Sequence, residues 1–188
     1  MSTLILAAIL GVAFGFALDR VGATNPNYIM GMLRLSNLHL AKTILLGIAV
    51  ASVLMFGGIQ LGIVDVGHMD VKATYWGVLI GGLMLGVGFA LAGYCPGTAL
   101  TAAATGRKDA LWFAVGGVLG AFLYALSHAW WKASGWLDAV AGGKVMLGLV
   151  EGADFVALWP TVDGIGLGLG IAGALMLLVA MVPDRLRK

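Results

Sequence analysis

A short break at the only cysteine interrupts the longest uncharged run of the chain. The run covers 73–106, which is longer than the ~20 helical residues of one membrane crossing. The residues of the break are Gly93, Tyr94, Cys95, Pro96, Gly97 and Thr98. Proline cannot continue a helix from the preceding turn, but its fixed φ suits the first position of a new helix. The sequence therefore predicts a short helix that begins at Pro96, with Cys95 as its N-cap.

The predicted helix start has the chemistry of an anion site. First-turn N–H groups have no partner within the helix, and such N-termini attract anions where broken helices line a cavity in a membrane. Gly97 lets a ligand approach the backbone, Thr98 adds a hydroxyl donor, and Cys95 supplies a weak S–H donor or a nucleophilic sulfur. The pattern favours an anion site, with a sulfur compound as one candidate ligand. The alternative is a proline kink beside a buried, inert cysteine.

A second break of the same kind occurs earlier in the chain. Asn25 followed by Pro26 is a strong pair of N-cap and first helical residue, and Thr24 lies directly before it. The sequence predicts a second short half-helix here, so that two half-helix N-termini could point at one site.

Blocks of sequence recur in the same order around the two breaks. Gly-Phe-Ala-Leu at 15–18 returns at 88–91, and the segment 49–54 is similar to 114–119. We therefore expect two related units, each composed of a helix, a short re-entrant helix and a helix, running parallel to each other. Their approximate bounds are 4–62 and 74–131.

The composition predicts a helical membrane protein. Of 188 residues, 61% are hydrophobic and 11% are charged, which excludes a soluble globular domain. A single cysteine cannot form an internal disulfide, and no basic run suggests nucleic acid. Three scattered histidines and one cysteine do not have metal-ligand spacing, so we expect neither a metal nor a cofactor. The apolar N-terminus lacks the features of a cleaved signal peptide and is expected to remain as the first helix.

The uncharged apolar segments predict an all-α polytopic protein with five crossings in a single membrane domain, 1–188. The crossings are 2–18, 43–64, 73–106, 110–131 and 164–183. Basic residues gather in alternate connections and at the C-terminus, whereas the other connections are net acidic. The positive-inside rule then places the N-terminus outside and the C-terminus in the cytoplasm. The segment 132–163 is expected to be an external loop with interfacial tryptophans, followed by the final helix, 164–183.

The two breaks resemble the repeats of the YeeE/YedE-type sulfur transport family. The run 88–100 around Cys95, followed by 106–111, is similar to the Cys-Pro motif of that family. The run 14–27, followed by 35–42, is similar to its first repeat. The resemblance covers about 4–126, and the Cys95 motif is its most specific part. Thr24 departs from the pattern, because many members have another cysteine there.

The resemblance implies a permease of the bacterial inner membrane for thiosulfate or a related sulfur or selenium compound. It places Cys95 where the substrate passes, whereas a relay of several cysteines would need a second subunit or a partner protein. Full-length members are about twice as long, so a homodimer or a second half-size membrane chain is expected, with a soluble sulfur-carrier protein as a further candidate partner.

The proposed site would supply hydrogen-bond donors to thiosulfate, which is a dianion. Backbone N–H groups of both half-helices, the hydroxyls of Thr24, Thr98 and Tyr94, and the neutral thiol of Cys95 could share the ion. The candidate substrate-binding residues are Cys95, Tyr94, Pro96, Gly97, Thr98, Gly93, Thr24, Asn25 and Pro26. Two other hypotheses stay open: a membrane sulfur-transfer protein with a persulfide on Cys95, and a structural subunit in which the break is only a packing kink.

Overall fold

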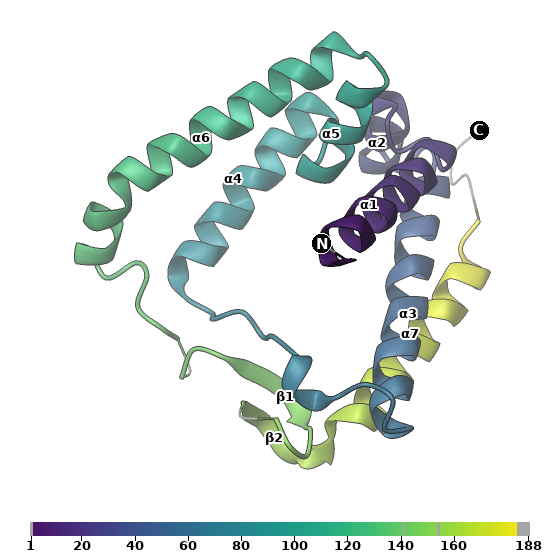
Figure 1. The fold of residues 1–188 in the computed structure, drawn as a ribbon, viewed down its shortest axis with the longest axis vertical. Helices are drawn as coiled ribbons and strands as arrows, with labels where there is room; N and C mark the ends of the chain where they lie inside the picture. Colours follow the sequence, from purple (N-terminus) through teal and green to yellow (C-terminus); the bar gives the residue numbers. More distant parts are fainter. Residues whose placement is uncertain (1, 141, 154, 184–188) are drawn as a thin grey trace. The chain divides into compact units, whose positions relative to one another are not determined.

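The computed structural model describes residues 2–140, 142–153 and 155–183, most of them in helices (Figure 1). The helices are α1 (Ser2–Arg20), α2 (Pro26–Leu33), α3 (His39–Gln60), α4 (Trp76–Ala92), α5 (Pro96–Ala104), α6 (Lys108–Ala133), α7 (Gly164–Met181) and the 3-10 turn η1 (Val66–His68). Two strands, β1 (Val145–Leu149) and β2 (Val156–Asp163), complete the fold. A long helix, a short helix and a long helix thus follow one another twice before the strands, while the predicted repeat of units 4–62 and 74–131 stays a prediction.

Five stretches within the described residues are long and apolar enough to cross a membrane. They are Thr3–Arg20, His39–Gln60, Trp76–Ala104, Lys108–Ala133 and Gly164–Met181, and the third of them contains both α4 and α5. Apolar side chains on these helices are widely exposed, for example 78% for Leu4 and 82% for Leu91, as expected where lipid covers them. The chain is therefore a polytopic helical membrane protein, as predicted, and the short strands are its departure from a purely helical fold.

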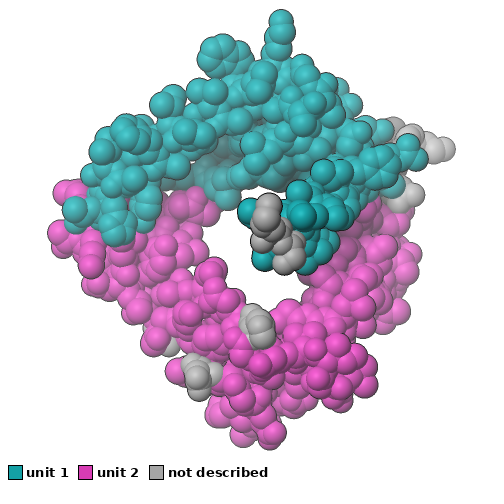
Figure 2. Space-filling model, viewed as in Figure 1, with its two compact units in different colours: residues 1–41, 83–129, 184–188 teal, residues 42–82, 130–183 magenta. Residues whose placement is uncertain are grey.

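The chain divides into two compact units (Figure 2). Unit 1 contains the described residues of 1–41 and 83–129, and unit 2 those of 42–82 and 130–183. These units are defined by spatial contacts, so each contains pieces of both predicted sequence repeats.

Two small clusters of buried residues form the core of unit 1. The first joins Ala23, Ile29 and Leu40, with Phe89 packed against it. The second joins the Tyr94 ring with alanines of α5 and with Ala110 of α6. Helices α1 and α5 are in contact, and a Cβ added to Gly15 would lie 3.9 Å from the Thr101 Cγ2. Small residues thus let the short helix α5 lie close to its neighbours.

Unit 2 contains structure that the sequence analysis did not predict. The segment predicted as the external loop 132–163 includes β1 and β2, which pair in parallel with Val145 opposite Val156 and Gly148 opposite Trp159. This segment is also bound to the chain before α4. The Thr74 N–H donates to the Gly143 carbonyl, and the Val140 N–H donates to the Thr74 carbonyl, both at 2.8 Å.

Candidate functional site

The turn before α5 has the geometry that the Cys-Pro pair predicts. Gly93 follows the last residue of α4 with a φ of +70° and donates its N–H to the Phe89 carbonyl at 2.9 Å. Cys95 is the N-cap of α5, with extended backbone angles, and Pro96 is the first helical residue. The Cys95 Sγ accepts from the Thr98 N–H at 3.4 Å, while the Cys95 N–H donates to the Thr98 Oγ1 at 3.0 Å. This reciprocal pair is a capping box, which confirms the predicted helix start.

The sulfur of Cys95 accepts hydrogen bonds inside the turn. Besides the Thr98 N–H, the Thr98 hydroxyl lies 3.3 Å from the Sγ and 3.2 Å from the Cys95 carbonyl oxygen. Cys95 is partly exposed, whereas Thr98 is buried. The sulfur is the acceptor in these contacts, and the S–H of a neutral Cys95 is a weak donor that a ligand could accept.

The turn before α2 is built on the same plan. Asn25 is the N-cap, its Oδ1 accepts from the Asn27 N–H at 3.0 Å, and Pro26 follows as the first helical residue. The preceding Thr24 is buried and donates its hydroxyl to the Asp19 Oδ1 at 2.8 Å. Both predicted caps are therefore present, and each turn is held by a buried hydroxyl residue.

The two turns lie against each other within unit 1. A Cβ built on Gly93 would come within 3.0 Å of the Pro26 Cβ and 3.4 Å of the Pro26 carbonyl oxygen. The first turn of α2 therefore packs directly on the residue that precedes the Cys95 turn. By contrast, no described atom lies within 4 Å of a Cβ built on Gly97, outside that residue's own helix backbone and chain neighbours. The backbone at Gly97 is open to approach, as the sequence analysis expected.

The hydroxyl of Tyr94 lies in a cluster with two charged side chains. It donates to the Asp109 Oδ2 at 2.7 Å and accepts from the Arg107 Nε at 2.8 Å, and Arg107 also binds that same carboxylate oxygen at 3.0 Å. The structure therefore brings Gly93, Cys95 and Pro26 together, while it engages the Tyr94 hydroxyl with Asp109 and Arg107. Asp109 was not predicted as a partner of Tyr94, although its position in the first turn of a helix was a signal that could have indicated it.

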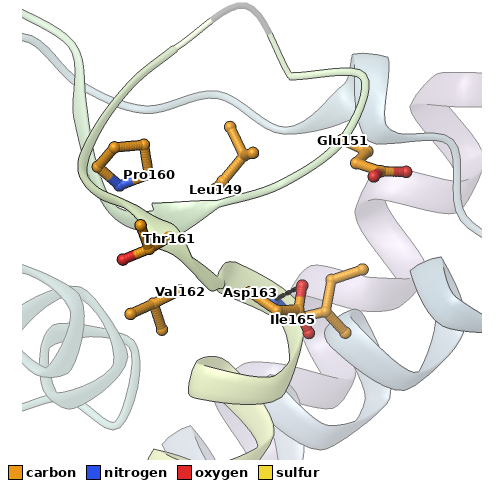
Figure 3. A pocket seen from close by; sticks show the side chains of 7 residues that line it. All are labelled: Leu149, Glu151, Pro160, Thr161, Val162, Asp163 and Ile165. Carbon is orange, nitrogen blue, oxygen red and sulfur yellow. Dashed lines mark hydrogen bonds between the residues drawn. The ribbon is translucent and has the colours of Figure 1, made fainter.

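Unit 2 contains a cavity of about 360 Å³ that holds none of the predicted site residues (Figure 3). Its lining consists of Leu149, Glu151, Pro160, Thr161, Val162, Asp163 and Ile165. The Asp163 carboxylate is committed to the start of α7, because it accepts from the backbone N–H groups of Ile165 and Gly166 at 3.2 and 2.7 Å. Among the described residues no group of three or more His, Cys, Asp and Glu side chains could hold a metal ion.

Comparison with known proteins finds a family and curated relatives. A family model described as "Sulphur transport" matches residues 25–182. Over 122 residues the chain is 31% identical to the "Probable transporter YedE" of Escherichia coli (strain K12). The aligned segment covers 64% of this chain and 29% of the relative. The chain is 30% identical over 122 residues to the protein of the same description from Salmonella typhimurium (strain LT2), with the same coverage. No solved structure matches the chain.

Proposed function

We propose, from the premise that this chain belongs to the sulphur transport family, that it passes a sulfur-containing anion such as thiosulfate across a membrane. The observation that carries the proposal is the contact between the two capped turns. Gly93 packs on Pro26 within unit 1, so that the starts of α2 and α5 are neighbours. One partly exposed thiol and the open backbone at Gly97 lie at the start of α5.

The chemistry of the turns suits a soft dianion. The backbone N–H of Gly97 and the S–H of Cys95 can donate to it without any cationic side chain, so the anion is bound weakly enough to leave again. The other first-turn positions offer no donor, because Pro96 has no N–H and the Thr98 N–H is bound to the Cys95 sulfur. In this proposal Cys95, Pro96, Gly97 and Thr98 form one wall, and Thr24, Asn25 and Pro26 form the other. The Cys95 thiol donates a transient hydrogen bond to the anion, and no covalent bond forms between Cys95 and the substrate.

The length of the chain shapes the proposal further. It covers 29% of each curated relative, so the activity of those proteins is not carried over as a whole. We propose that a second copy of this chain or another half-size membrane chain completes the path. We also propose the bacterial inner membrane, with the N-terminus outside. The hydrogen bonds of Thr74 to Gly143 and Val140 support one part of this topology, namely that the start of the third crossing and the segment 132–163 lie on the same side of the membrane.

A sulfur-transfer function is the second candidate, and the hydrogen bonds to the Cys95 sulfur favour it. The Thr98 N–H and hydroxyl, at 3.4 and 3.3 Å, would also stabilise a thiolate. That thiolate would attack the outer sulfur of thiosulfate; the S–S bond breaks, sulfite leaves with the electron pair, and Cys95 carries a persulfide. A soluble sulfur-carrier protein would then take the sulfur from it.

Uptake of radiolabelled thiosulfate by cells without importers of their own tests the first function. Wild type, Cys95→Ala and Cys95→Ser are compared at matched levels in the membrane. Uptake that is lost in both variants supports passage at the thiol. Uptake that is equal in all three removes the thiol from the mechanism. No uptake by the wild type, together with a persulfide on Cys95 by mass spectrometry, supports sulfur transfer. No uptake and no persulfide fits a different substrate, an absent partner chain or a structural subunit.

A further inference from the structure

We infer that Tyr94, Arg107 and Asp109 are positioning residues that hold the Cys95 turn in place from the opposite end of α5. The inference rests on the proposed function only in giving Cys95 a substrate; the mechanical link between the cluster and the thiol stands on the geometry alone. Tyr94 is the residue directly before Cys95, and Arg107 and Asp109 flank the start of α6.

The ring of Tyr94 lies along α5. Its side chain is 1% exposed and packs against Ala99 and Ala102 of α5 and Ala110 of α6. The Phe113 ring closes this pocket with its centroid 6.1 Å away. Alanines at these positions leave the room that a ring needs, so Tyr94 connects the first residue of the Cys95 turn with the turn between α5 and α6.

The hydroxyl at the end of this ring is fixed by charge-assisted hydrogen bonds. Tyr94 donates to Asp109, accepts from Arg107, and these two bind each other, so that three polar groups form a closed triangle with contacts of 2.7 to 3.0 Å. Hydrogen bonds to ionised partners are shorter and stronger than neutral ones. The Arg107 and Asp109 side chains are 38% and 51% exposed, so the triangle lies at the surface of unit 1 while the ring reaches its core.

The consequence falls on the thiol. With the ring held at both ends, the backbone at Cys95 has little freedom, and its N–H stays bound to the Thr98 hydroxyl at 3.0 Å. Without the Tyr94 hydroxyl, Arg107 and Asp109 can still pair with each other, but the ring is no longer tied to them. The Cys95 turn then opens more often and the thiol reacts faster.

The rate at which N-ethylmaleimide alkylates Cys95 measures this directly, because the chain has one cysteine. Purified full-length protein in lipid vesicles is compared as wild type, Tyr94→Phe, Asp109→Asn and Tyr124→Phe. Tyr124 is the matched control, since its ring on α6 is 46% exposed and belongs to neither core cluster. We expect alkylation to be faster by about tenfold or more in Tyr94→Phe, which loses both hydrogen bonds of the hydroxyl to charged groups. A smaller increase is expected in Asp109→Asn, whose amide oxygen still accepts from the hydroxyl but carries no charge. Tyr124→Phe should behave as wild type.

Uptake kinetics separate positioning from general destabilisation. A displaced thiol raises the thiosulfate concentration needed for half-maximal uptake, whereas partial unfolding lowers only the maximal rate. Unchanged alkylation in Tyr94→Phe and Asp109→Asn, with both proteins folded, would overturn the inference. If Tyr94→Phe does not fold, Asp109→Asn and Arg107→Lys decide by the same criterion, because both keep the ring. If the wild type shows no uptake, the alkylation rates still decide the positioning role while the transport proposal fails.

Discussion

Gly93 and Pro26 are packed against each other, with 3.0 Å between the Pro26 Cβ and the position that a Gly93 Cβ would occupy. Because Gly93 also has a φ of +70°, any side chain there is both strained and crowded. We expect Gly93→Ala to lower the free energy of unfolding by about 1–3 kcal/mol, the cost of one residue forced into this backbone region. Thermal unfolding of the purified protein measures the loss, and a variant as stable as wild type would refute the close packing.

Gly97→Ala is the matched substitution at the other glycine of the break. Gly97 lies inside α5, and an added Cβ meets no described atom within 4 Å beyond its chain neighbours and its own helix backbone. Alanine is also the better helix former, by about 1 kcal/mol. We expect a protein at least as stable as wild type that takes up less thiosulfate, because the methyl group stands where the anion would approach the backbone. Full uptake by a folded Gly97→Ala protein would exclude close approach at this residue.

The cap and the thiol functions of Cys95 can be separated by two substitutions. Serine is a preferred N-cap and accepts from the Thr98 N–H as the sulfur does, whereas alanine loses the cap at a cost of about 1 kcal/mol. Cys95→Ser should therefore unfold at or above the wild-type temperature, and Cys95→Ala below it. Differential scanning fluorimetry in detergent gives both values. Equal loss of stability in the two variants would show that the cap contributes nothing.

The turn before α2 depends on the Thr24 hydroxyl. This buried group donates to the Asp19 Oδ1 at 2.8 Å, and Thr24→Val removes the donor while keeping the shape. We expect a loss of roughly 1–2 kcal/mol in the free energy of unfolding for Thr24→Val, in the range for hydrogen bonds to charged groups. Thr24→Ser keeps the hydroxyl and serves as the control. If urea titration finds the two variants equally stable, the Asp19 contact is not needed.

The ion pairs of Asp70 make the contact between its loop and Lys144, the residue before β1, sensitive to acid. The hydrogen bond from Lys72, and to a lesser extent the one from Lys144, holds the pKa of the Asp70 carboxyl below its ordinary value of 3.8. A lowered pKa in the folded state means that the stabilisation is present above pH 3.8 and is lost as the pH falls through the folded value. Because Asp70 is exposed, the effect is small and is weakened by salt.

Hydrogen exchange at the Thr74 and Val140 amides reports this loss. These N–H groups bond to Gly143 and Thr74, close to the Lys144 contact with Asp70. We expect their protection to fall below pH 3.8 after correction for the intrinsic exchange rate. Asp70→Asn should show the same fall at neutral pH. Protection that is independent of both changes would mean that the backbone bonds alone hold the loop.

The local features of the site could be predicted from the sequence, because they depend on neighbouring residues. Proline cannot donate an N–H and fixes φ, so Pro26 and Pro96 mark the helix starts, and Asn25 and Cys95 occupy the cap positions before them. The five apolar stretches are also local properties of composition.

Contacts between residues that are distant in the chain could not be predicted from the sequence. The acidic first turn of α6 marks Asp109 as a candidate partner, but no residue near Tyr94 shows that the hydroxyl reaches this carboxylate. The sequence likewise does not show that Gly93 touches Pro26. The pairing of β1 with β2 was not predicted for the same reason. Polar and glycine residues interrupt that segment, and Pro160 in β2 argues against a strand from sequence alone.

The junction between β2 and α7 has a mechanical consequence. Asp163 is the last residue of the strand and the N-cap of the helix, so no connecting residue separates the two elements. Gly164, the first helical residue, is closely packed, since a Cβ there would lie 2.9 Å from the Leu149 carbonyl oxygen of β1. A hinge needs residues whose backbone angles can change freely. This junction has no connecting residue, and the close packing at Gly164 restricts its backbone. If α7 changes its tilt in the bilayer, we therefore expect β1 and β2 to move with it, so that the helix and the two strands form one rigid body.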